Sequence, residues 1–257
     1  MNVPIRIIGV ATTFFWIFLI AFFATAAYSV KDLQFSFGEP QISIGNELLF
    51  SLPVHVLNKG YYDIGAFNVT TCILDSDNNT LAKGSTFERV LLRGVEVTVY
   101  HNMSLNIDHL LDQAPEYLFN DSEFTIGAWV GLRLAQVIPV QAQSNFSFPW
   151  GAPFYGFAVG TPSFSAVDLT RIQASVPVSF ENHAFFDLAG NITLRLYNSY
   201  GMLIGEESLV FSVPQHSPYN GNVEFEVTAD EVTPSGWFEV FFGSELFSYG
   251  PMVVSYG

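Results

Sequence analysis

Histidine, cysteine and carboxylate side chains are the groups in this sequence that could bind a metal or carry out acid–base chemistry. No two histidines have the compact spacing of metal ligands, since even His101 and His109 are separated by a predicted turn. A lone histidine in a strand is more often packed or solvated than a ligand, so we expect no metal and no cofactor. The five histidines are His55, His101, His109, His183 and His216.

The remaining candidates for chemistry are also weak. The stretch DSDNN, with Asp75 and Asp77, faintly resembles a calcium loop but lacks the required Gly and the distal Glu. Cys72, the one cysteine, lies in a strand-like stretch without a nearby base, which favours a small packed residue over a catalytic thiol. Nucleophile-elbow, zinc-protease and phosphate-loop motifs are absent. A triad can assemble without local motifs, but the expectation is a protein that is not an enzyme.

The N-terminus predicts a membrane anchor. Residues 7–27 contain no charge and would span about 30 Å as a helix, the thickness of a hydrocarbon core. Arg6 precedes this stretch and the next basic residue is Lys31, so the N-terminus is expected in the cytoplasm and the rest outside. The alternative is a cleaved signal peptide, with a small-residue site at residues 24–26, although signal peptides usually have shorter apolar regions.

Composition limits the partners. The formal charge of −15 disfavours nucleic acid, because an acidic surface repels phosphate. Hydrophobic residues make up 49% of the chain, which is enough to form cores. Membrane lipid, through residues 7–27, and proteins of a membrane or surface assembly are the expected partners.

The remainder of the chain repeats itself. Pro53 corresponds to Pro177 and Asn58 to Asn182, and the sequons at Asn68 and Asn191 follow in the same order. We therefore predict an anchor at residues 1–32 and two copies of one domain at 33–152 and 153–257. The proline- and aromatic-rich residues 145–157 predict a stiff, packed joint between the copies.

Each copy has the pattern of antiparallel strands. In residues 96–105, alternate positions are apolar and polar, with Val97, Val99, His101, Met103 and Leu105 on one face. Hairpin loops are expected at DSDNNT and YNSYGM, and one short helix at NIDHLLDQAPEYLF, with Leu110, Leu111 and Leu118 on its apolar side. Pro53 and Pro177 predict edge strands or bulges. The number of short strands indicates an all-β protein made of two β-sandwiches.

A corner shared by both copies contains most of the repeated residues. It consists of an asparagine, two aromatic rings and an aspartate, followed by a sequon. The second copy has phenylalanine where the first has tyrosine, so the hydroxyls are dispensable there. The aspartates are expected to accept backbone N–H bonds in the turn after the rings. The corner residues are Asn58, Tyr61, Tyr62, Asp63, Asn182, Phe185, Phe186 and Asp187.

Six N-glycosylation sequons are present, more than chance would give. Those at Asn68, Asn102 and Asn191 fall on the polar faces of predicted strands, where a glycan could be tolerated. The alternative is that Asn, Ser and Thr are simply common in exported β-proteins. The candidate residues are Asn68, Asn78, Asn102, Asn120, Asn145 and Asn191.

The stretch from Pro53 to Ser85 resembles the WHy domain, the water-stress and hypersensitive-response domain of group-2 late embryogenesis abundant proteins. Lys59 and Gly60 stand where that family has Pro-Asn, and the second copy also lacks the proline. The stretch LAQVIPVQAQSNFSFPWGAPF resembles the end of membrane-anchored archaeal proteins of this type. The resemblance implies immunoglobulin- or fibronectin-like sandwiches without catalysis, associated with stress protection and membranes. These observations predict a membrane-anchored structural or interaction protein; the alternative is a module that binds lipid or another apolar ligand between its sheets.

Overall fold

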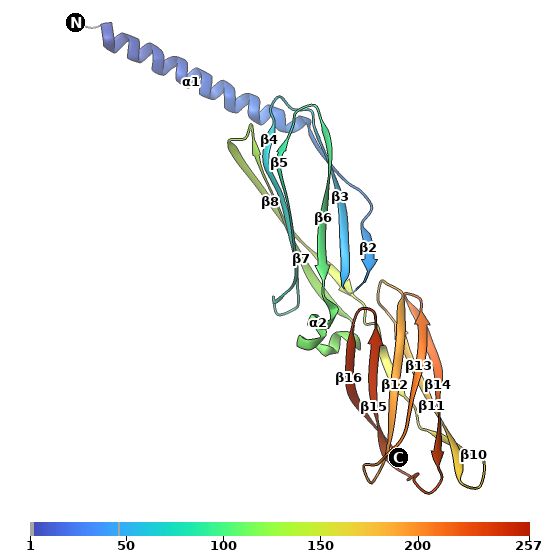
Figure 1. Cartoon of the computed structure of the whole chain (residues 1–257). Coiled ribbons are helices and arrows are strands. Elements are labelled where there is room, and N and C mark those ends of the chain that lie inside the picture. The colour runs from blue at the N-terminus through green and yellow to red at the C-terminus, as the bar shows by residue number, and fades with distance from the viewer. Residues whose placement is uncertain (1–2, 46) are drawn as a thin grey trace.

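A computed structural model describes residues 3–45 and 47–257, with the side chains of the first helix described from residue 12 on. The predicted fold class is confirmed, because antiparallel sheets make up most of the chain and one long apolar helix precedes them. Figure 1 shows the helix and two sandwiches following one another end to end, with the C-terminus at the far end.

Helix α1 (Val3–Ser29) is the apolar N-terminal segment. Its part from Thr12 on, together with the 3₁₀ turn η1 (Val30–Asp32), is long and apolar enough to cross a membrane, with a mean hydropathy of 1.9. Most of its described side chains are exposed, as lipid-facing side chains would be. Length and composition therefore agree with the predicted anchor.

The first sandwich, sandwich 1, packs two antiparallel sheets against each other. One sheet has β3 at its centre, with β6 on one side and both β1 and β2 on the other; the second has the order β5-β4-β7-β8. The strands are β1 (Leu33–Phe37), β2 (Gln41–Ile44), β3 (Leu48–Asn58), β4 (Ile64–Leu74), β5 (Thr80–Leu91), β6 (Glu96–Leu105), β7 (Ser122–Leu134) and β8 (Ile138–Trp150).

The second sandwich, sandwich 2, pairs its strands in the same pattern. Strand β11 is flanked by β14 on one side and by β9 and β10 on the other, and the second sheet has the order β13-β12-β15-β16. Each strand of one half thus has a counterpart in the other. The strands are β9 (Tyr155–Val159), β10 (Ser163–Ala166), β11 (Arg171–Asn182), β12 (Leu188–Asn198), β13 (Leu203–Val213), β14 (Ser217–Thr228), β15 (Gly236–Ser244) and β16 (Ser248–Tyr256).

The predicted alternation on β6 is confirmed. Val99, His101, Met103 and Leu105 are buried and Val97 is half-buried, whereas the residues between them are exposed. The two predicted hairpin loops connect β4 to β5 and β12 to β13. The predicted short helix forms the connection between β6 and β7, as helix α2 (Ile107–Gln113) and the 3₁₀ turn η2 (Pro115–Leu118).

For Pro177 the predicted bulge is present nearby, since the pairing of β11 with β9 shifts its register between Ser179 and Glu181. The alternative prediction, that Pro53 and Pro177 mark edge strands, is wrong. Both lie in central strands, β3 and β11. The carbonyl of each proline accepts a backbone N–H at 2.8 Å, from Gly38 and Gly160, in the gap between the two short neighbouring strands. The N–H and C=O of a strand residue point to the same side. A proline N–H, if there were one, would therefore point into this gap, so its absence removes no hydrogen bond to a paired strand.

Candidate functional site

The repeated corner connects β3 to β4 in sandwich 1 and β11 to β12 in sandwich 2. We call residues 58–64 corner 1 and residues 182–188 corner 2. Each corner lies at the end of its sandwich that faces the preceding element: corner 1 contacts α1, and corner 2 contacts sandwich 1.

Asn58 holds corner 1 together from inside. Its side-chain amide donates to the carbonyls of Tyr62 at 3.0 Å and Leu91 at 3.2 Å, and its Oδ1 accepts the Gly60 N–H at 3.1 Å. Asn58 is 2% exposed. The one side chain therefore pairs backbone groups of the turn and of the last residue of β5, which would otherwise be costly to bury.

Asn182 makes the corresponding bonds in corner 2 and one more. Its amide donates to the carbonyls of Phe186 at 3.0 Å and of Val213 and Pro214, both at 3.2 Å. Its Oδ1 accepts the Ala184 N–H at 3.0 Å, and the side chain is fully buried. The sequence analysis selected both asparagines, and the structure gives them one shared structural role.

The aspartates act differently from the prediction. Asp63 accepts the backbone N–H of Arg93, and Asp187 that of Gln215, both at 2.9 Å. The donors therefore lie in the β5–β6 and β13–β14 connections and not in the turn after the aromatic pair. Each carboxylate fastens a second loop to its corner, a long-range contact that no local pattern indicates.

The aromatic pair of corner 1 packs on the end of α1. Tyr62 meets Phe22 edge-to-face at a centroid distance of 5.7 Å, and its hydroxyl lies 2.8 Å from the Thr25 hydroxyl. Tyr61 stacks on Tyr28 at 6.2 Å. The tyrosine hydroxyls that the second copy dispenses with are thus used at least once in the first.

The aromatic pair of corner 2 packs on sandwich 1. Phe185 meets Phe50, Phe148 and Trp150 at centroid distances of 6.0, 5.4 and 6.2 Å. Phe186 is 5% exposed and packs on Phe185 at 5.3 Å. This contact is apolar, so phenylalanine fits it and a hydroxyl would need a partner.

A backbone hydrogen bond attaches each corner to the incoming chain. The Lys59 N–H donates to the Asp32 carbonyl, and the His183 N–H to the Ala152 carbonyl, both at 3.0 Å. Lys59 and His183 occupy equivalent positions, directly after the corner asparagine. The two joints are therefore built on the same plan.

A glycine allows close approach at each joint. A Cβ on Gly60 would lie 2.1 Å from the Ser29 hydroxyl oxygen, and a Cβ on Gly151 would lie 1.9 Å from the His183 carbonyl oxygen. Neither distance is compatible with a real contact. Both joints thus depend on a missing side chain.

Charged groups reinforce the joint between the sandwiches. The His183 ring lies between Asp121, at 2.9 Å, and Glu181, at 3.1 Å, and stacks on Tyr155 at 4.1 Å. Burial lowers the pKa of His183, but the hydrogen bonds and charges of the two carboxylates outweigh it and raise the pKa above its usual value. The Ala152 N–H also donates to Asp121, at 2.8 Å.

The α2–η2 connection adds a further contact across this joint. The ring of Phe119, just after η2, meets Phe242 and Tyr249 of sandwich 2 at 5.6 and 5.9 Å. The Ser248 N–H donates to Asp108 of α2 at 3.0 Å. One continuous apolar core includes residues of both sandwiches, so the structure shows the packed joint that residues 145–157 predicted.

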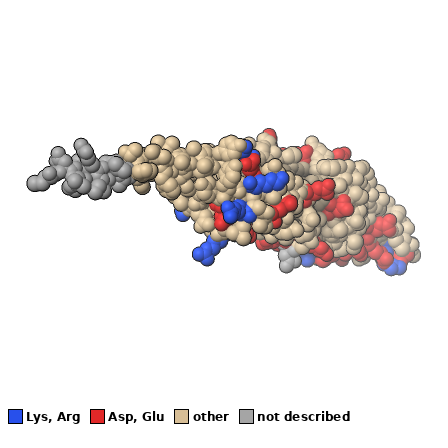
Figure 2. All heavy atoms as spheres, turned by 90° about the horizontal axis from the view of Figure 1, so that it is seen from above, with Lys and Arg blue, Asp and Glu red and all other residues tan. Residues whose placement is uncertain are grey.

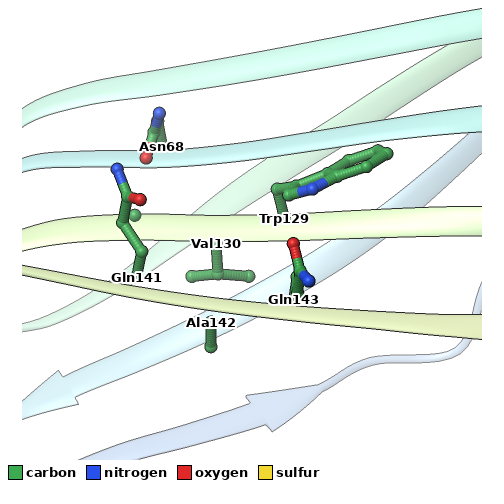
Figure 3. Close-up of a pocket in the computed structure, with 7 residues that line it drawn as sticks. Asn68, Trp129, Val130, Gln141, Ala142 and Gln143 are labelled. Carbon is green, nitrogen blue, oxygen red and sulfur yellow. The ribbon is translucent and has the colours of Figure 1, made fainter.

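The six sequon asparagines are all exposed, and the structure does not bring them together into one site. Asn68 lines an open cleft of about 230 Å³ on the outer face of β4, β7 and β8, and Asn191 lines a separate one of about 740 Å³ beside corner 2. Figure 3 shows Asn68, Trp129, Gln141 and Gln143 on one side of these strands. Three amides beside an indole can donate to and accept from a neutral polar ligand, and a glycan on Asn68 would begin in this cleft.

The residues considered above as candidates for chemistry make structural contacts. Both ring nitrogens of the buried His101 lie near threonine hydroxyls, Thr71 at 2.8 Å and Thr86 at 2.9 Å, and burial lowers the pKa of His101. Asp75 accepts the backbone N–H groups of Asp77 and Asn79 and so closes the β4–β5 hairpin. Cys72 is buried.

Comparisons with known proteins name no family. No protein-family model matches the chain, and no curated protein does. Among solved structures, red sea bream transglutaminase is similar over 88% of this chain and 31% of its own, at 18% identity and a TM-score of 0.32. The periplasmic chaperone SfaE is similar over 84% of this chain and 96% of its own, at 10% identity and a TM-score of 0.28. The chain spans about a third of the transglutaminase, and likeness at this level indicates no shared activity. The resemblance to the WHy domain stays a prediction.

Proposed function

We propose that the chain is a membrane-anchored, extracytoplasmic, non-catalytic structural and interaction protein. In this proposal the two sandwiches form a stiff stalk that holds its far end at a fixed distance from the membrane. The observation that carries the proposal is the repeated joint, in which each corner clamps the preceding element with an equivalent backbone bond at 3.0 Å. Such a device fixes direction between elements, whereas a flexible linker would not.

The far end of sandwich 2 is where we expect a protein partner. Leu169, in the β10–β11 loop, is fully exposed at 102%, and Tyr200, in the β12–β13 loop, is 85% exposed. Contiguous exposed apolar surface marks interaction sites, and Leu169 and Tyr200 would supply the apolar part of such a surface here. A partner bound there would be held away from the membrane.

Capture from native membranes tests this function. We expect the full-length protein to retain a partner, and the double variant Leu169→Ser/Tyr200→Ser to lose it. Val210→Ser is the matched control, because Val210 is 79% exposed on the side of sandwich 2 and not at its tip. Recovery of the unmodified chain as a monomer alone would contradict the assembly role.

A second candidate function is binding of an apolar ligand. A cleft of about 180 Å³ with an almost wholly apolar lining opens between the sheets of sandwich 1, beside Phe50, Met103 and Phe148. This volume is below the ~300–1,000 Å³ usual for small-molecule sites, so it suits part of an acyl chain. Mass spectrometry of lipids that co-purify with the full chain tests the idea. A bound lipid that Met103→Phe displaces would support it, and an empty spectrum would contradict it.

A further inference from the structure

The end of sandwich 1 from which α1 leaves differs in charge from the rest of the chain. This membrane-proximal end comprises residues 30–32, 58–64, 88–96 and 133–138. It holds five of the nine Lys and Arg residues but only four of the 24 Asp and Glu residues, in a chain of net charge −15. Figure 2 shows Lys and Arg gathered near the junction with the helix and Asp and Glu over the rest of the visible face. The five cations are Lys31, Lys59, Arg89, Arg93 and Arg133.

The exposed charge at this end is mainly positive. All five cations are exposed, whereas of the four carboxylates only Glu96 is exposed and Asp32, Asp63 and Glu88 are half-buried. The carboxylate of Asp63 also accepts the backbone N–H of Arg93 at 2.9 Å, which leaves the Arg93 guanidinium out of that bond. The cations are therefore available to an anionic surface.

The loop tips at this end are apolar. Leu92 and Val95, in the β5–β6 connection, are 54% and 43% exposed, and Val137, in the β7–β8 turn, is 68% exposed. Apolar tips beside basic residues are the composition that binds a membrane interface. Tyr28 and Tyr61, both more than half exposed, add aromatic rings of the kind enriched at that depth.

The packing of α1 determines the depth of this end. The uncharged residues 7–27 need to stay within a hydrocarbon core of about 30 Å. Corner 1 contacts the helix at Phe22, Thr25 and Ser29, where this apolar stretch ends. If the helix spans the bilayer, the membrane-proximal end lies at its surface.

We propose that the membrane-proximal end of sandwich 1 is seated on the bilayer and binds anionic lipid headgroups. Leu92, Val95 and Val137 enter the interfacial region, and the five cations contact lipid phosphates. The proposal rests on the membrane anchor of the proposed function. It adds that the lipid also binds the folded domain.

Nitroxide labels on the whole chain in bilayers test whether the membrane-proximal end is seated on the bilayer. Single cysteines replace Phe15, Val137 or Ser199 in a Cys72→Ala background, and relaxation by oxygen and by a water-soluble nickel complex reports the depth of each. We expect Phe15→Cys in the hydrocarbon, Val137→Cys at headgroup depth and Ser199→Cys in water. A deep Phe15→Cys with Val137→Cys in water would overturn the seat and leave the anchor intact. An aqueous Phe15→Cys would overturn both.

Lipid charge supplies the second measurement. The fraction of Val137→Cys label at headgroup depth should be higher in vesicles that contain phosphatidylglycerol than in vesicles of phosphatidylcholine. The variant Lys59→Gln/Arg93→Gln/Arg133→Gln should reduce this preference on the order of fivefold per charge. Lys83→Gln/Arg171→Gln/Arg195→Gln removes three cations elsewhere and should leave it unchanged. Equal effects of the two triple variants would contradict the proposal.

Discussion

The two corners have the same hydrogen-bond network and different aromatic surfaces. In both, a buried asparagine pairs the turn, an aspartate fastens a second loop, and a backbone N–H binds the incoming chain. Tyr61 and Tyr62 of corner 1 meet an apolar helix where it leaves the predicted membrane span, whereas Phe185 and Phe186 of corner 2 meet other aromatic rings. The difference shows that one internal hydrogen-bond network occurs in two surroundings, one at the end of an apolar helix and one within an aromatic core.

The largest loss of stability is expected when the buried asparagine of either corner is removed. Asn182→Ala would leave three carbonyls and one N–H without their side-chain partner, and we expect a loss of about 3 kcal/mol in the free energy of unfolding. Asn58→Ala should cost about 2 kcal/mol, because Asn58 serves two carbonyls. Urea unfolding of the full chain in detergent measures both. Asn220→Ala, at an exposed position of β14, is the control, and costs equal to it would contradict the shared role.

Substitution of the glycine at each joint should destabilise the two joints to different extents. Gly151→Ala should cost about 2 kcal/mol, because its Cβ would meet a backbone oxygen that cannot rotate away. Gly60→Ala should cost about 1 kcal/mol, because the first atom that it meets is the Ser29 hydroxyl. The double variant Gly60→Ala/Ser29→Ala should lose less free energy of unfolding than the two single variants lose together. Strict additivity would indicate that the Ser29 side chain does not cause the strain.

The tyrosine hydroxyls distinguish the aromatic surfaces. Tyr62→Phe removes the hydrogen bond to Thr25, and we expect the helix end to lose about 1 kcal/mol of protection against amide hydrogen exchange. Tyr61→Phe should change little, because Tyr61 is 56% exposed and contacts Tyr28 through its ring. A larger effect of Tyr61→Phe would reverse the roles assigned to the pair.

The smallest expected effect is that of pH on the second joint. The raised pKa of His183 means that its charged contacts with Asp121 and Glu181 stabilise the joint fully below about pH 6.5. This stabilisation is lost as the pH rises through the higher pKa of the folded state. Because His183, Asp121 and Glu181 are all partly exposed, we expect the free energy of unfolding to change by less than about 1 kcal/mol. Unfolding measured between pH 5 and 8 should show this slope, and His183→Gln should remove it.

The sequence predicted the fold class, the alternation on β6, the short helix and the residues of both corners. These follow from local periodicity and from the internal repeat. The partners of Asp63 and Asp187 could not be predicted, because they lie in other loops. The central position of Pro53 was missed because the break between β1 and β2 becomes visible only once their pairing with β3 is known. His183 was dismissed as isolated, because Asp121 is distant in sequence and approaches it only through the joint.

The stiffness of the joint between the sandwiches is the central claim, and one distance measurement tests it directly. Spin labels at Lys83→Cys and Glu207→Cys, both exposed, report the separation of the two sandwiches in a Cys72→Ala background. We predict one narrow distance distribution for the membrane-reconstituted full chain, and a broad one once Gly151→Ala is added. A broad distribution without that substitution would contradict the stalk.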